Sequence, residues 1–124
     1  MKLTQKQRDK LWADNGPYSE VHLIIETRIL DDREARKFVI VEININPLSF
    51  EIIKKNYLQF KDDVIIQEII DNAEYRGQPF GYVACTFMYE YNDPTVIFEA
   101  ERCVEYSKAV LIKIHKYVID YLKI

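Results

Sequence analysis

Two stretches of strict alternation constrain the fold of this chain more than any other feature. From Glu20 to Leu30 every second side chain is apolar or threonine, and the same alternation returns from Lys37 to Asn46. A repeat of two residues is typical of a β-strand that buries one face. The polar connection DDREAR between the two stretches predicts an antiparallel hairpin. Odd-numbered residues must pair with odd-numbered ones, because a slip of one residue would place an apolar face opposite a polar one.

The two faces of the predicted hairpin differ in composition. The odd face is apolar and is expected to be buried; it consists of Val21, Leu23, Ile25, Thr27, Ile29, Val39, Val41, Ile43 and Ile45. The even face is too mixed for simple exposure to solvent; it consists of His22, Ile24, Glu26, Arg28, Phe38, Ile40, Glu42 and Asn44.

A long amphipathic helix is predicted from about Glu99 to Leu122. Ile112 and Ile119 fall outside its apolar stripe, so the apolar arc is wider than one sheet can cover. We expect a second subunit to cover the remainder, which predicts a homo-oligomer, a dimer or higher, through the C-terminal helix. A coiled-coil dimer and a helix sunk in its own core are the competing interpretations. The stripe itself consists of Val104, Ser107, Val110, Leu111, Ile114, Tyr117, Val118 and Tyr121.

Capping residues, breakers and propensity predict the remaining elements. These are a helix over about 4–14, a helix that starts at Asn46-Pro47 and reaches about Phe60, a helix from a cap at Asp62 or Asp63 to Arg76-Gly77, a strand over 80–91 that is either central or covered on both sides, and a candidate fourth strand over 95–98. The predicted fold class is α+β. It has an antiparallel sheet of three to four strands packed against helices and a long C-terminal helix, in a single domain over 1–124.

The composition limits the classes of function. The chain has 124 residues, a formal net charge of −3 and a pI of about 5.4, so no basic field favours a polymeric nucleic acid. Five of its first ten residues are charged, and no apolar run reaches the roughly 18 residues of a membrane span. We therefore expect no membrane partner and a cytoplasmic location. Cys85 and Cys103 lie in apolar patterns without metal-ligand spacing, so both are expected to be reduced core residues.

Groups suited to catalysis are few. His22 and Glu26 share a strand face but lie about 13 Å apart along it, so a metal or acid-base site there would need Glu42 from the neighbouring strand. A polar patch is the competing interpretation. His115 lies between lysines on the long helix, so a solvated position is expected. With three glycines and no known catalytic fingerprint, we expect neither an enzyme, nor a metal, nor a cofactor.

The segment RGQPFGY, residues 76–82, contains two of the three glycines of the chain. Gly77 fits the end of a helix, whereas Gly81 at a strand start indicates that another group packs closely there. Aromatic rings, a guanidinium and bare backbone are also the groups that hold a nucleotide. The competing interpretation gives these residues packing and surface roles. The ligand-binding interpretation predicts a non-catalytic site formed by Arg28, Arg76, Phe80, Gly81, Tyr82, Tyr91, Asn92 and Arg102.

In length and layout the chain resembles the phage anti-Thoeris sponge family, with the segments YRGQPFGY, 75–82, and EYNDP, 90–94, as the most suggestive parts. Proteins of that family sequester the cyclic ADP-ribose isomers made by TIR-domain immune enzymes. The resemblance implies tight binding without hydrolysis in the host-cell cytoplasm, by an oligomer with pockets at protomer edges. It also implies an adenine contact from Phe80 or Tyr82, pyrophosphate contacts from Arg28, Arg76 or Arg102, and a polar contact from Asn92.

Two other functions remain open from the residues. A protein-binding inhibitor or immunity protein would use the acidic, tyrosine-rich surface as an interface. A small enzyme would depend on His22 and Glu26.

Overall fold

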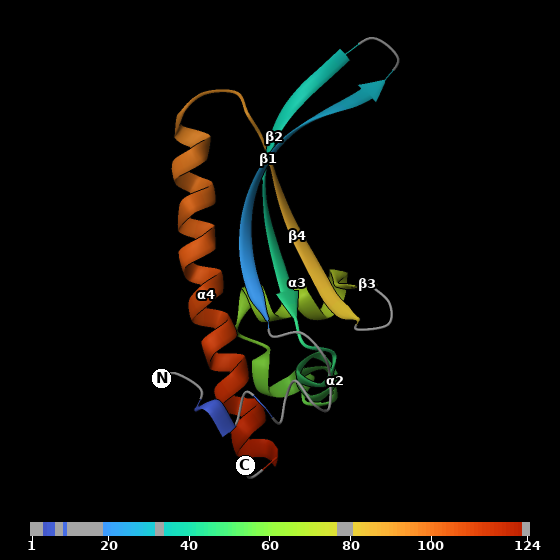
Figure 1. The fold of residues 1–124 in the computed structure, drawn as a ribbon, viewed down its shortest axis with the longest axis vertical. Helices are drawn as coiled ribbons and strands as arrows, with labels where there is room; N and C mark the ends of the chain where they lie inside the picture. The colour runs from blue at the N-terminus through green and yellow to red at the C-terminus, as the bar shows by residue number, and fades with distance from the viewer. Residues whose placement is uncertain (1–3, 7–8, 10–18, 32–33, 77–80, 123–124) are drawn as a thin grey trace.

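The computed structural model describes residues 4–6, 9, 19–31, 34–76 and 81–122, and Figure 1 shows their arrangement. The elements are β1 (Glu20–Asp31), β2 (Glu34–Ile45), α2 (Pro47–Lys55), the 3-10 helix η1 (Tyr57–Phe60), α3 (Val64–Asn72), β3 (Glu74–Arg76), β4 (Tyr82–Glu90) and α4 (Thr95–Leu122). The strands form one antiparallel sheet in the order β1-β2-β4-β3. The α+β prediction with a long C-terminal helix is confirmed. The expected helix over 4–14 lies mostly outside the described residues.

The β1–β2 hairpin pairs odd residues with odd ones, as expected: Leu23 faces Val41 and Ile25 faces Val39. A register irregularity between Ile29 and Asp31 lets β2 begin at Glu34, three residues earlier than predicted. The pairing of β2 with β4 ends at Phe38, so the outer ends of β1 and β2 continue as a two-stranded arm, which projects past β4 in Figure 1.

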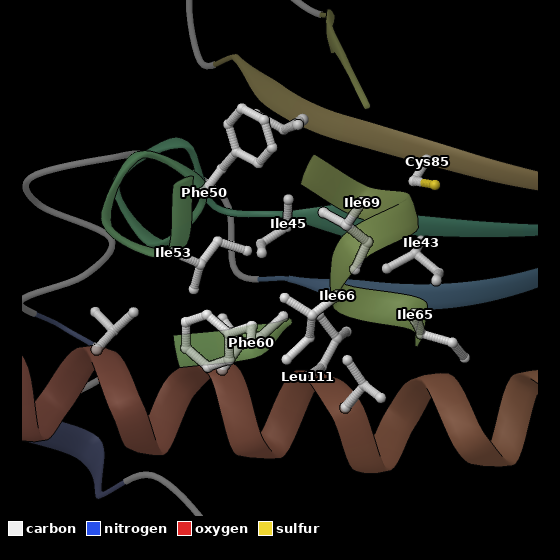
Figure 2. Close-up of a cluster of buried hydrophobic side chains, with 14 of the residues drawn as sticks. Ile43, Ile45, Phe50, Ile53, Phe60, Ile65, Ile66, Ile69, Cys85 and Leu111 are labelled. Atoms are coloured by element: carbon white, nitrogen blue, oxygen red, sulfur yellow. The ribbon is translucent and has the colours of Figure 1, made fainter. Parts of the chain in front are cut away.

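The helices cover the odd face of the sheet. One core cluster joins Ile43, Ile45, Val83 and Cys85 to side chains of α2, η1, α3 and α4, and Figure 2 shows Leu111 of α4 facing this group. A second cluster joins Val39 and Val41 to Val96 and Ala100 at the start of α4. The central position of β4 is confirmed, since it lies between β2 and β3.

The prediction that β1 buries its odd face is wrong for most of the strand. Val21 packs against both core clusters, but Leu23 is 37% exposed, Ile25 49% and Ile29 77%. The cause is geometric, because the cores centre on β2 and β4, and β1 lies at the margin of the sheet.

The predicted fourth strand over 95–98 is also wrong, because these residues form the first turn of α4. The side chain of Asp93 accepts a hydrogen bond from the backbone N–H of Thr95 at 2.8 Å, as a helix-capping residue does. The Thr95 hydroxyl and, to a smaller extent, this backbone N–H lower the pKa of the Asp93 carboxyl. The capping interactions outweigh the β-propensity of Thr95, Val96 and Ile97.

The fourth strand is instead β3, which replaces the expected end of the preceding helix. The N-cap of α3 is Asp63, as predicted, but the helix ends at Asn72. Tyr75 then packs edge-to-face against Phe50, with ring centroids 5.6 Å apart, and β3 pairs with the start of β4. Arg76 is therefore a strand residue, so the explanation of Gly77 as a helix stop is wrong, and Gly77 itself lies outside the described residues.

His115 is buried on α4, at 4% exposure, which corrects the expectation of a solvated histidine. The helix turns this position toward the core, in line with Leu111 and Val118. Burial lowers the pKa of His115 to about 4. The imidazole is consequently neutral at neutral pH.

Acid should destabilise the protein through His115. Its pKa is depressed in the folded state, so below the unfolded value of about 6.5 the unfolded chain binds a proton that the folded chain refuses. We expect this group to remove about 3 kcal/mol of unfolding free energy as pH falls from 7 to about 4. Urea unfolding across this range should show a smaller acid loss for His115→Gln than for the wild type. The exposed His22→Gln is the control, and an unchanged acid loss in His115→Gln would contradict the prediction.

Candidate functional site

The even-numbered residues of the sheet form a face that we call the open face. None of them belongs to the two core clusters of described residues, so it is the side away from α2, α3 and α4. Its centre is apolar: Ile24 pairs with Ile40, which pairs with Met88. Ile40 is 3% exposed, whereas Ile24 and Met88 are 37% and 45% exposed. Phe38, at 8% exposure, lies next to this centre on β2.

Ion pairs surround the apolar centre of the open face. The residues of its margin are exposed or partly exposed, so each pair contributes at most about 1 kcal/mol and its charges stay accessible. Glutamates outnumber arginines by six to three among the described members of these pairs. The margin is therefore acidic. The pairs are His22–Glu20 at 2.7 Å, Arg28–Glu26, Arg36–Glu34 at 3.2 Å, Arg36–Glu90 at 3.4 Å, Arg76–Glu42 at 4.0 Å and Arg76–Glu74 at 3.2 Å.

Two arginines lie directly opposite each other at the arm end of the open face. Arg28 of β1 is the cross-strand partner of Arg36 of β2. Like charges at such positions repel, and here each guanidinium is also bound to a carboxylate. Glu34 raises the pKa of Arg36 by hydrogen bonding and by its charge, and Glu90 adds to this. The Arg28 Nη1 atom also lies 3.6 Å from the sulfur of Met88.

Arg36 was missed as a site residue because the sequence places it in the polar connection DDREAR. The register irregularity near Asp31 shortens that connection and puts Arg36 on β2 with its side chain on the open face. The alternation of Arg36 with Phe38 and Ile40 is the signal that could have revealed it.

The described residues of the RGQPFGY segment, Arg76, Gly81 and Tyr82, lie at the other end of the open face. Arg76 is the cross-strand partner of Tyr82, and its guanidinium contacts Glu42. Gly81 is partly buried and directly precedes β4, while Phe80 lies outside the described residues. Of the predicted ligand residues, Arg76 and Tyr82 are thus brought together.

The other predicted ligand residues lie elsewhere. Tyr91 packs against the second core cluster and beneath the Lys37 ammonium, which is 4.8 Å from its ring centroid. Asn92 is exposed in the turn before α4, and Arg102 is exposed on α4. Tyr82 and Tyr91 are separated by the length of β4, about 30 Å at 3.3 Å per residue. The seven of these residues that the structure describes therefore do not surround one ligand of nucleotide size.

The histidine considered for catalysis is bound to a carboxylate on its own strand, since His22 contacts Glu20 at 2.7 Å. Glu42 is its cross-strand partner, while Glu26 pairs with Phe38. No group of three or more histidine, cysteine or acidic side chains arranged for a metal ion occurs among the described residues. Burial raises the pKa of the Cys85 thiol to about 11, so this cysteine is a poor nucleophile.

A hollow of about 260 Å³ lies at the turn from α2 into η1. It is lined by Lys55, Asn56, Tyr57, Leu58 and Gln59. It contains none of the predicted ligand residues.

Within the described part of the chain, no helix has the length and apolar character needed to cross a membrane. No protein-family model, curated protein or solved structure matches this chain.

Proposed function

We propose that this protein acts as an inhibitor or immunity-type protein that binds another protein through the open face. The observation that carries the proposal is the anatomy of that face. An exposed apolar centre, Ile24 and Met88 over Ile40, is enclosed by paired charges. An apolar centre with a polar margin is the usual arrangement of a protein–protein interface.

The charge of the margin defines the partner. Six glutamates against three arginines favour a surface with basic side chains around an apolar patch. The same excess of carboxylates opposes a polyanion. Because the ion pairs remain exposed, an incoming arginine or lysine can exchange with Arg28 or Arg76 at little cost.

Met88 provides the test of this interface. Met88→Glu places a charge at the apolar centre, on a side chain that is 45% exposed, so the fold should be retained. We expect a protein captured by the wild type from a lysate of the source cells to be lost, with binding weakened at least about tenfold. The matched control is Ile112→Glu on α4, at 48% exposure, which should bind normally. If wild type and Met88→Glu capture the same proteins equally, the open face is not the interface.

A second candidate is the sequestration of a nucleotide signal, such as a cyclic ADP-ribose isomer, without hydrolysis. The opposed guanidiniums of Arg28 and Arg36 support it, because two adjacent forked cations suit a pyrophosphate. The exposed Met88 side chain beside Arg28 offers an apolar surface for a base. The ligand would have to displace Glu26 and Glu34. In a phage-encoded protein such binding would lower the free signal in the host cytoplasm and block Thoeris signalling.

Titration calorimetry and thermal shift with ADP-ribose, its cyclic isomers and pyrophosphate test this candidate. A ligand at 100 times its dissociation constant adds about 2.7 kcal/mol to the folded state. We expect Arg28→Gln and Arg36→Gln to abolish the shift, and the exposed Arg102→Gln on α4 to retain it. The bound compound should be recovered intact after denaturation. Loss of binding in Arg76→Gln alone would place the site at the RGQPFGY end, and no shift with any of these compounds would reject the candidate.

A further inference from the structure

β1 is a long edge strand without a proline, a lysine or a central bulge. It lies at one margin of the sheet, and Glu20 to Leu30 pair on their outer side with no other strand of the described residues. Edge strands are normally kept short or are interrupted by proline, lysine or a bulge. β1 spans 12 residues and contains neither proline nor lysine, and its one irregularity lies at its end, between Ile29 and Asp31. The opposite edge, β3, has 3 residues.

β1 carries five of the fourteen exposed large apolar side chains among the described residues. Leu23, Ile24 and Ile25 lie together at its middle and are 37%, 37% and 49% exposed. Burying such a run against a second strand is favourable, and the backbone groups of the edge supply the hydrogen bonds.

The charges of β1 show which strand fits. On the open face the strand carries, in order, Glu20, His22, Ile24, Glu26 and Arg28. When this series is aligned with its own reverse, Glu20 faces Arg28 and Glu26 faces His22. Each carboxylate therefore faces a guanidinium or an imidazole. β1 is thus complementary to an antiparallel copy of itself.

We propose that two copies of this chain pair along their β1 edges, antiparallel, with Ile24 facing Ile24 of the second copy. Glu20 then faces Arg28 of the second copy, and His22 faces Glu26 of the second copy. On the other face, Leu23 meets Ile25 of the second copy. The two-fold axis passes between the two Ile24 residues, so the Ile24 contact occurs once and each of the other contacts occurs twice.

Neighbouring registers lack this complementarity. A shift of two residues in one direction places Glu20 opposite Glu26, and in the other direction it places His22 opposite Arg28. A shift of one residue places the open face of one copy opposite the helix-covered face of the other. The charge pattern therefore selects the register centred on Ile24.

The paired sheet runs through both copies, four strands from each, with both open faces on the same side. This contact shares Ile24 and Arg28 with the open face, but it does not include Ile40 or Met88, which lie on β2 and β4. It is distinct from the helix-mediated oligomer predicted from the sequence. On α4 the exposed Ile112 lies among charged residues such as Lys113 and Lys116.

Disulfide trapping tests the register. Facing residues of antiparallel strands have Cα atoms about 4.5–5.5 Å apart, within the range that a disulfide spans. Ile24→Cys should therefore give a covalent dimer under mild oxidation. Glu26→Cys, which would lie about 13 Å from its counterpart along the strand, should not. The wild type, with Cys85 buried and Cys103 half-buried, measures the background. Trapping by Glu26→Cys and not by Ile24→Cys would overturn the proposal.

A charge exchange tests the pairing itself. In sedimentation velocity, Arg28→Glu should weaken the dimer by about tenfold or more, because it creates two facing glutamate pairs. Adding Glu20→Lys to the same chain should restore it. Arg102→Glu on α4 makes the same change in net charge and should leave the dimer intact, and circular dichroism monitors folding of each variant. A monomeric wild type, or a dimer lost in Arg102→Glu and kept in Arg28→Glu, would overturn the proposal.

Discussion

The packing of α4 across the odd face of the sheet is the contact on which the rest of the structure depends. Ile114 and Val118 of α4 are fully buried in the main core, and Val96 and Ala100 cover the outer part of β2. Since α2 and α3 join the same core, every described helix contributes to one side. A sheet covered on one side keeps its other face and its first strand available. Both proposed contact surfaces, the open face and the β1 edge, are consequences of that asymmetry.

Much of the fold follows from local patterns in the sequence, and the errors occur where a tertiary contact outweighs a local preference. Asn46-Pro47 predicted the start of α2 correctly, and Asn46 does cap it. Asp93-Pro94 is a turn signal, but the β-branched residues after it favoured a strand; in the structure Asp93 accepts a hydrogen bond from the Thr95 N–H, and α4 begins at Thr95. The residues of β3 were expected to end the preceding helix, and they form a strand because β4 and Phe50 supply partners that no local window contains.

The candidate site was less predictable than the fold for a related reason. The mixed composition of the even face pointed to a functional surface, and Arg28, Arg76 and Tyr82 do lie there. Which of them are neighbours depends on register, and one irregularity near Asp31 decides that Arg28 opposes Arg36. Tyr91 was predicted as a ligand residue because an aromatic side chain next to a turn is typical of a binding site. Its ring instead packs against the second core cluster.

The position of α4 in the chain has a consequence for biosynthesis. Every strand of the sheet precedes this helix in the sequence, so a ribosome releases the whole sheet before the segment that covers it. The β1–β2 hairpin, whose contacts are local, forms early, and Val39 and Val41 stay solvated until α4 is complete. During that interval the nascent chain exposes both faces of the hairpin, and this is the stage at which a chaperone has the most apolar surface to bind.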